Sequence, residues 1–534
     1  MINLKTNTKA ILISLLLCIH CSVVKSTVTL PSIPSTQFLI TSYGASTSLT
    51  DNSTAINTAI KAANSAGGGI VICPAGIFLS GPITMMSNVE LYLAKGDTLT
   101  MLPYGSGNGS PSGSYPNNGT TNSYTPFIYG SGLTNIAVRG TGAIEGNGTA
   151  WWAAYEANSN IVRPYLIRFK GCNTVLIDSI ILRNSPNVHV CLGQSSTMGS
   201  NGTISNITVY APSTSPNTDA IDTWYWNGIN IINCNLSEGD DNVAMDSYSE
   251  NVMIKGCTLG YGHGISVGSY ATNVNNVTVD SCTFTNTTNG IRLKSERGRG
   301  GSGSAAVYNL SYSNITMKNV EWPFYITSYY NTSSPSTSDP AQAITTTTPT
   351  WRNIYFKNIT VTGSEYAGFI WGLPEQSVDN VTFDNVQISA TSRGMQTCFV
   401  DTLIFKNCSS ITIPAKEGNA IYSPYDTLNV SGLNPTTGAS TSCSNTSSGL
   451  EEVTYSNLHC FPNPAKGNSV TITADNTITK INIYTLTGVQ AKEETVDNAT
   501  QYQLNISALP SGYYILNVQF TNGTSSSLKL IKTQ

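Results

Sequence analysis

Residues 228–284 read GINIINCNLSEGDDNVAMDSYSENVMIKGCTLGYGHGISVGSYATNVNNVTVDSCTF, and this stretch decides the fold. Three short apolar runs, GINI, NVMI and NVTV, begin at Gly228, Asn251 and Asn276, with steps of 23 and 25 residues between them. The runs alternate as half-buried strands do, and Asn, Gly and Ser separate them. A repeat of this period, with several short strands and no helix, predicts one coil of a parallel β-helix per step.

The same register continues on both sides of this stretch. Similar runs begin at Asn206, Asn309, Asn353, Asn380 and Thr402, and the steps from 206 to 402 are 22, 23, 25, 33, 44, 27 and 22 residues. A near-constant step with occasional insertions indicates a solenoid whose extra residues form loops on one side. The predicted fold class is therefore all-β, a right-handed parallel β-helix.

Four cysteines support this register. Cys234, Cys257, Cys282 and Cys408 each lie six residues after the start of their own coil. Because stacked strands lie about 4.8 Å apart, the first three should form a ladder in the interior. No histidine or carboxylate stands beside them at ligand spacing, so we predict buried free thiols rather than a metal site. The sequence leaves the pairing of any disulfides open.

The segments before the coils have patterns of their own. Residues 1–26 carry lysines, the apolar run AILISLLLCI and small residues up to Ser26, which is the pattern of a signal peptide. Asp51–Thr54 can cap a helix over the run AINTAIKAAN, and Gly67–Gly69 can end it. Such a helix would cover the open end of the solenoid.

A second body follows the coils. From about Thr436 the polar segment TTGASTSCSNTSSG replaces the coil pattern, and the later runs INIYTL, YYILNV and SLKLIK do not keep its register. We predict a signal peptide over 1–26, a β-helix over 27–435, a Ser/Thr-rich linker over 436–454 and a small β-sandwich-like module over 455–534.

Composition narrows the classes of function. Charged residues make up 10% of the 534 residues, and the formal net charge is -4. The chain lacks the clustered basic face that binds nucleic acid, and no segment after the signal peptide reaches the roughly 18 apolar residues of a membrane span. We therefore predict a soluble exported monomer that needs no cofactor.

Acidic residues recur at one phase of consecutive coils. Asp219 lies 13 residues after its coil start, Asp240 and Asp241 lie 12 and 13 after theirs, and His263 lies 12 after its own. Equal phase on stacked coils predicts one surface patch. Like charges this close destabilise a fold unless a proton or a cation relieves them, and proteins carry that cost mainly at functional sites.

This patch suits the cleavage of a glycosidic bond. One carboxylic acid must protonate the leaving oxygen while an ionised carboxylate activates water or attacks the sugar. Asp240, between Asp219 and Asp241, is the candidate for the protonated group because two like charges flank it. Arg292 and Lys294, on the next coil, are spaced i, i+2 and face the same way on a strand. They could bind a carboxylate, which suggests an acidic sugar.

Four motifs now resemble a known family. NTD from Asn217, GDD from Gly239, GHG from Gly262 and RLK from Arg292 occur in this order, with further similarity in SYGA, PAGIFLSGPI, GNGTAWW and NSPNVHV. The set is similar to the signature of the family 28 polygalacturonases, over approximately residues 38 to 433. The resemblance implies a pectin-lyase-like solenoid that hydrolyses the α-1,4 galacturonosyl linkages of pectin. In that family Ile more often stands between the two basic residues.

The resemblance also implies catalytic roles. Asp240 would be the general acid, Asp219 and Asp241 would activate water with inversion, and His263 would support the acid. Carboxylates on adjacent rungs start about 5 Å apart, however, and that spacing by itself suits a retaining enzyme better. Inversion therefore rests on the resemblance.

The remaining candidate residues would contact substrate. By resemblance, Arg292 and Lys294 would hold a galacturonate carboxylate on the leaving-group side. Asn217 and Tyr330 are further candidates for substrate binding. His189, in NSPNVHV, would line the substrate or be held by hydrogen bonds in a turn.

Two other functions remain open. A pectate lyase on the same fold would cleave by elimination, with an acidic calcium cluster and an arginine base. A non-catalytic polysaccharide binder would suit the low charge and the high Thr and Asn content. Whether the action is endo or exo depends on loops that close one end of the site, and the insertions at residues 104–126 and 332–350 are where such loops would arise.

The C-terminal module has its own resemblance. FPNPAKG from Phe461, INIYTLTG, LPSGYYILNV and the terminal KLIK resemble the C-terminal sorting module of the type IX secretion route in Bacteroidetes. This implies an interaction with secretion machinery and a secreted or cell-surface location. The alternative is a carbohydrate-binding β-sandwich, but every Trp precedes the linker, whereas such a module usually presents exposed aromatic residues.

Overall fold

The computed structural model describes residues 28–533 apart from a set of gaps. These are 106–112, 121, 194–195, 332–334, 408, 414–420, 423–433, 438–457, 486–489 and 522–524. The chain divides into two compact units, Met1–Ser442 and Cys443–Gln534. The predicted signal peptide, Cys408 and most of the predicted linker lie outside the described residues. Strand β33 (Asn434–Thr437) carries the first unit two residues past the expected boundary at 435.

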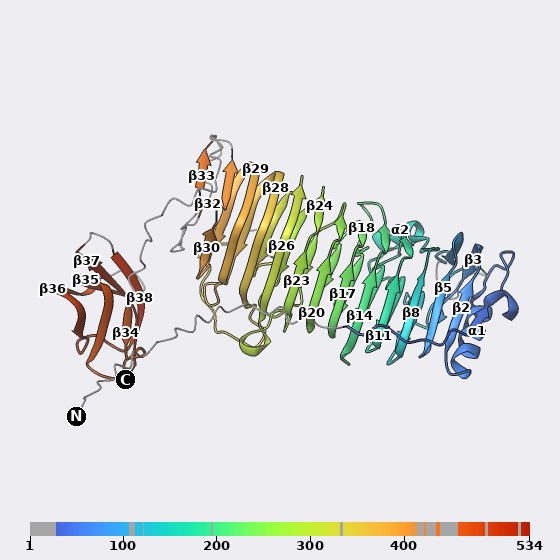
Figure 1. The fold of residues 1–534 in the computed structure, drawn as a ribbon, viewed down its shortest axis with the longest axis horizontal. Coiled ribbons are helices and arrows are strands. Elements are labelled where there is room, and N and C mark those ends of the chain that lie inside the picture. The colour runs from blue at the N-terminus through green and yellow to red at the C-terminus, as the bar shows by residue number, and fades with distance from the viewer. Residues whose placement is uncertain are drawn as a thin grey trace, which may run out of the picture. The chain divides into compact units, whose positions relative to one another are not determined.

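Each coil of the first unit pairs in parallel with the next. On one face, β13 (Val190–Gly193) pairs with β16 (Ile221–Trp224), and the pairing continues through β19 (Val243–Met245), β22 (Ile265–Val267) and β25 (Asn289–Lys294). A strand thus pairs with the strand three places further along the chain. Figure 1 shows these coils stacked side by side. The predicted parallel β-helix is confirmed.

The interior of the stack is apolar because every second residue of a strand points inward. Ile221, Val243, Ile265 and Ile291 are register partners on successive coils, and all four are fully buried. Burying each such side chain stabilises the fold by about 1.5–3 kcal/mol relative to exposure. The alternate positions face outward, so they are free to carry polar chemistry.

A column of asparagines explains the register seen in the sequence. Asn251, Asn276, Asn309, Asn353 and Asn380 begin coils, and each has a left-handed backbone, with φ between 53° and 58°. Each of the last four donates a side-chain hydrogen bond to the asparagine of the preceding coil, over 2.8–3.4 Å. Asparagine tolerates this conformation and supplies both a donor and an acceptor, so one residue type serves the turn and the stacking.

The cysteine ladder is also confirmed. Cys234, Cys257 and Cys282 are free thiols in the core and are about 1% exposed. They occupy equivalent positions in three successive coils and act as small apolar side chains.

The predicted helix is α1 (Ser53–Ser65), and its apolar face is buried. It contacts the first strands, and Figure 1 shows it at the end of the stack where the first coils lie. The predicted capping segment Asp51–Thr54 lies at the start of the helix, and Asp51 is the residue that caps it. Asn52 holds the N-cap position, but its side chain donates to Leu79 O, and Asp51 instead accepts from the backbone N–H of Ser53.

Two features near the N-terminus were not predicted. Helix α2 (Gly148–Ala157) follows a left-handed Asn147 and buries Trp151 and Trp152, yet its sequence lacks a clear apolar stripe. The register read from the sequence also starts only at Asn206, whereas within the predicted β-helix of 27–435 the coils begin earlier, since β5 (Val89–Leu93) already pairs with β8 (Thr134–Gly140). The long segment between these two strands hides the period in the sequence.

The second unit has a core of its own. Its described strands are β34 (His459–Phe461), β35 (Ser469–Thr485), β36 (Gln490–Asn505), β37 (Gly512–Phe520) and β38 (Ser525–Lys532), and they form one antiparallel sheet. In neither unit does a described helix have the length and apolar character to cross a membrane.

Candidate active site

The site lies on the outer face of the strands β16 to β25. Asp222, Ala244, Ser266 and Arg292 are register partners on four successive coils and form an outward row. Asp219, Asp241 and His263 each lie three residues before a member of that row. Asp219 and Asp241, which share one phase in the sequence, therefore lie at stacked positions, and His263 stacks with Asp241 although its phase is one residue smaller.

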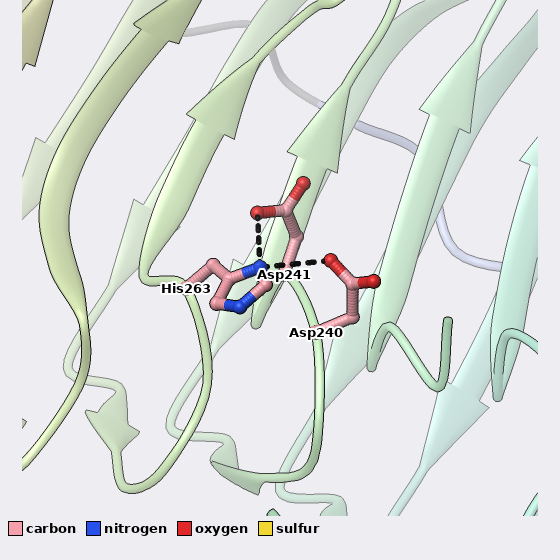
Figure 2. A group of neighbouring side chains, drawn as sticks. All are labelled: Asp240, Asp241 and His263. Carbon is pink, nitrogen blue, oxygen red and sulfur yellow. Dashed lines mark hydrogen bonds and ion pairs between the residues drawn. The ribbon is translucent and has the colours of Figure 1, made fainter. Parts of the chain in front are cut away.

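Asp240 is held between two side chains. Its Oδ2 accepts a hydrogen bond from Nδ2 of Asn217 at 3.3 Å, and its Oδ1 lies 2.9 Å from Nδ1 of His263. The same imidazole nitrogen is 3.9 Å from Oδ1 of Asp241, so His263 faces both carboxylates (Figure 2). The side chains of His263 and Asp240 are 34% and 21% exposed, whereas that of Asp241 is 2% exposed. Of the two adjacent aspartates, only Asp240 is open to a ligand.

Asp241 is fixed as an anion. Burial alone would raise its pKa, but the charges of Lys294 and Arg292 and hydrogen bonds from Lys294 and Ser266 lower it. Nζ of Lys294 lies 2.6 Å from Oδ2, Oγ of Ser266 lies 2.6 Å from Oδ1, and Nη1 of Arg292 lies 3.4 Å from Oδ1. Both carboxylate oxygens are therefore occupied by donors.

Asp219 has the opposite electrostatic environment. Burial raises its pKa well above the ordinary aspartate value, and the charges of Asp222, Asp240 and Asp241 raise it further. The sequence predicts the retained proton on Asp240, whereas burial raises the pKa of Asp219. A proton is therefore retained in this group of carboxylates at a pH where an isolated aspartate would have lost it.

Further carboxylates in this region were missed by the sequence argument. Burial and the charge of Asp246 raise the pKa of Asp222, and burial raises the pKa of Asp246 to about 7. Burial also raises the pKa of Glu238, which is fully buried. The repeat does mark Asp246. It lies 18 residues after the start of its coil at Gly228, and Lys294 lies 18 residues after the start of its own coil at Asn276.

Arg163 is the other residue that was missed. Its side chain is 3% exposed and donates to the carbonyl oxygens of Pro186 and Pro216 at 2.8 and 2.6 Å. It also donates to Oδ1 of Asn217 at 2.8 Å. A guanidinium only donates, so this bond turns the amide NH2 of Asn217 toward Asp240. No local sequence signal connects Arg163 with a motif 54 residues later.

The remaining predicted residues are placed as follows. The ring centroid of Tyr330 lies 5.3 Å from Nζ of Lys294 and 5.7 Å from Cζ of Arg292, so this tyrosine borders the cations. His189 is fully buried, its Nδ1 lies near the carbonyl oxygens of Thr218 and Asp219, and burial lowers its pKa to about 4. Of the two interpretations of His189, the turn-bonded histidine is the one observed.

The donor set fits a metal ion poorly. Asp240, Asp241 and His263 offer ligand atoms within 4.8 Å of one another. However, the ammonium of Lys294 already lies against Asp241, and Arg292 adds a second positive charge on the same carboxylate. A divalent cation would have to displace these two positive side chains or bind against their repulsion. In addition, imidazole is not a ligand that calcium prefers.

A cluster of carboxylates with raised and lowered pKa values, beside a histidine and two cations, has the groups that acid–base cleavage of a glycosidic bond requires. The fold and the site define a glycoside hydrolase. Sequence comparison agrees, and the chain belongs to the glycosyl hydrolases family 28, whose model matches residues 107–409.

Individual relatives support this assignment. The chain is 34% identical over 368 residues to an endo-polygalacturonase of Pectobacterium carotovorum subsp. carotovorum, an alignment that covers 64% of this chain and 86% of that protein. The solved polygalacturonase from Erwinia carotovora ssp. carotovora is 30% identical, with a TM-score of 0.53 and coverage of 68% and 95%. A hyperthermoactive exopolygalacturonase from Thermotoga maritima, 22% identical, shares the fold with a TM-score of 0.53 over 75% and 94%.

The second unit matches a different family. Residues 459–533 match the secretion system C-terminal sorting domain, as the tail motifs predicted. The chain is therefore secreted to the outside of the cell or to its surface.

Proposed function

We propose that this protein hydrolyses polygalacturonate, the galacturonate backbone of pectin. The observation that carries the proposal is the pairing of an accessible Asp240, held by Asn217 and His263, with an anionic Asp241 held by Lys294. The relatives named endo-polygalacturonase support the substrate assignment.

In this proposal Asp240 protonates the glycosidic oxygen, because it is more exposed than Asp241 and therefore within reach of a polymer lying on this face. His263 and Asn217 orient its carboxyl group. Asp241, which is fixed as an anion, activates the attacking water, and Asp219 helps to bind that water.

The hydrogen bonds of Asp241 support inversion. Donors on a carboxylate oxygen lower its nucleophilicity, and Lys294 and Ser266 each donate to one oxygen of Asp241. Asp241 is thus better suited to polarise water than to attack the sugar. This argument opposes the one from spacing, since carboxyl groups about 5 Å apart are typical of retaining enzymes. Proton NMR of the first-formed reducing ends distinguishes the two outcomes, and a product with the anomeric configuration of the substrate would overturn inversion.

The two cations have different roles in the proposal. Lys294 is 6% exposed in its side chain and engaged by Asp241, so it mainly holds that aspartate. Arg292 is 16% exposed and makes only a long contact with Asp241, so it is the group that receives a galacturonate carboxylate. Tyr330 lies beside both cations and limits their movement.

Incubation with polygalacturonate tests the proposal. We expect new reducing ends, no products that absorb in the ultraviolet, and no action on a neutral polygalactan of similar length. Ultraviolet absorption would indicate elimination, and binding without any new reducing ends would indicate a non-catalytic protein. The variant Asp240→Asn should bind the polymer as the native protein does and lose nearly all turnover.

A further inference from the structure

A second pair of basic residues lies upstream of the carboxylates on the same face. Strand β10 (Ile167–Lys170) reads IRFK, and Arg168 and Lys170 are its outward, partly exposed residues, while Ile167 and Phe169 are buried. The spacing is that of Arg292 and Lys294 in RLK. We call Arg168 and Lys170 the upstream basic pair, and Arg292 and Lys294 the downstream basic pair.

The strand register places the two pairs in the same columns. Arg168 pairs with Cys191, and Cys191 pairs with Asp222, so Arg168 lies in the same outward row as Arg292. Two pairings separate Arg168 from Asp222, and two separate Ala244 from Arg292. At about 4.8 Å per pairing, each basic pair lies about 10 Å from the nearer of the two coils that carry the catalytic aspartates.

The surroundings of the two pairs are alike in a further respect. The guanidinium carbon of Arg168 lies 4.7 Å from the ring centroid of Tyr165, as that of Arg292 lies 5.7 Å from the ring of Tyr330. In both places an aromatic ring contacts the cation from one side.

Electrostatics favour an anionic ligand at the upstream pair. Burial lowers the pKa of Lys170, and the like charge of Arg168 lowers it further. A bound anion would relieve this repulsion. The residues between the pair and the site do not oppose such a ligand, because burial and neighbouring charges raise the pKa of the Cys191 thiol and of the Asp222 carboxyl, which favours their neutral forms.

We infer that Arg168 and Lys170 bind a second uronate carboxylate of the substrate, on the opposite side of the cleaved bond from Arg292. The inference rests on the proposed function for the identity of the polymer. A polyuronate that lies along the outward row meets a basic pair on each side of the aspartates. The two arginines are five pairings apart, about 24 Å, so only oligomers of several sugars reach both.

The test uses galacturonate oligomers of increasing length and the full chain. In the native protein kcat/KM should rise with length until both pairs are occupied. The double variant Arg168→Gln/Lys170→Gln should act normally on the shortest cleaved oligomer but lose about tenfold on an octamer, as expected for the loss of a charge-assisted contact. Lys318→Gln, which removes an exposed lysine at the end of strand β26 (Val307–Lys318), is the matched control.

Binding separates this inference from the proposed function. Calorimetry with a galacturonate octamer and Asp240→Asn should show a tenfold weaker affinity once the upstream pair is also replaced, whether or not the native protein hydrolyses the polymer. A fully methyl-esterified octamer should bind both proteins equally. Equal binding of the acidic octamer to the two proteins would overturn the upstream site, while a native protein without hydrolysis would overturn the proposed function alone.

Discussion

Nζ of Lys294 lies 2.6 Å from Oδ2 of Asp241, and both side chains are almost completely buried. This ion pair joins two coils of the β-helix and fixes the charge of the carboxylate that is best placed to activate water. Because neither group reaches bulk solvent, each depends on the other for its charged state.

Replacement of Lys294 by Met should therefore affect both stability and activity. A buried carboxylate left without its partner costs about 3–5 kcal/mol, and the altered charge of Asp241 should lower kcat by at least a hundredfold. Urea unfolding and reducing-end assays measure the two effects. The double variant Lys294→Met/Asp241→Asn should recover stability without activity; if it stays as unstable as the single variant, the ion pair is not the cause.

Asp246 should make stability depend on pH. Its pKa in the folded protein is about 7, above the roughly 3.9 of an unfolded aspartate, so its contribution is fully present below pH 4 and is lost as the pH rises toward 7. The free energy of unfolding should therefore fall less between pH 4 and 7 in Asp246→Asn than in the native protein. Parallel falls in the two proteins would contradict the raised pKa.

The pH dependence of kcat identifies the proton donor. A general acid must be protonated, so the native rate should fall at high pH as the donor ionises. If Asp240 is the donor, Asp240→Asn loses at least a thousandfold in kcat and no longer shows this fall, whereas Asp219→Asn is slower but keeps it. The reverse pattern would assign the proton to Asp219, whose pKa burial raises.

Arg163 should act on turnover through Asn217. Without the guanidinium, nothing fixes which end of the amide faces Asp240, so Arg163→Met should lower kcat about tenfold to a hundredfold with little change in KM. Arg163→Lys should restore part of kcat, because an ammonium also only donates. A change confined to thermal stability would mean that Arg163 serves only to join the two proline carbonyl oxygens.

Chelation should leave activity unchanged. Lys294 and Arg292 already neutralise Asp241, so a divalent ion gains little at the Asp240, Asp241 and His263 cluster. Dialysis against EDTA followed by assay with and without added calcium tests this expectation. Loss on dialysis and recovery with calcium would show that the acidic cluster binds the ion.

Much of the fold was predictable because the coil repeats its chemistry in each turn. The asparagine that begins a coil is visible in the sequence, and so are the cysteine six residues later and the aspartates at equal phase. The first coils lie inside the predicted β-helix of 27–435, but their register was not found, since long insertions separate their strands. Helix α2 was missed because its buried residues, chiefly the adjacent Trp151 and Trp152, do not recur at helical spacing. Trp151 instead packs against the rings of Tyr104 and Tyr124.

The site was predictable in position but not in its hydrogen bonds. Their positions in the repeat bring Asp219, Asp241 and His263 together. The contact between Lys294 and Asp241, however, spans two strand pairings and depends on the side-chain conformations of both residues. Arg163 reaches Asn217 from a distant segment, and no periodic pattern marks such a residue. The distribution of protons among neighbouring carboxylates likewise depends on burial, which the sequence does not give.

The asparagine column has a consequence for how this protein can change in length. In this column the asparagine of one coil donates one side-chain hydrogen bond to the asparagine of the coil before it. This bond is still present where the step between coils is 33 or 44 residues long. A whole coil can therefore be duplicated or deleted far from the aspartates without altering any contact among them. Evolution of this enzyme can adjust how much polymer lies against it independently of the chemistry that cuts it.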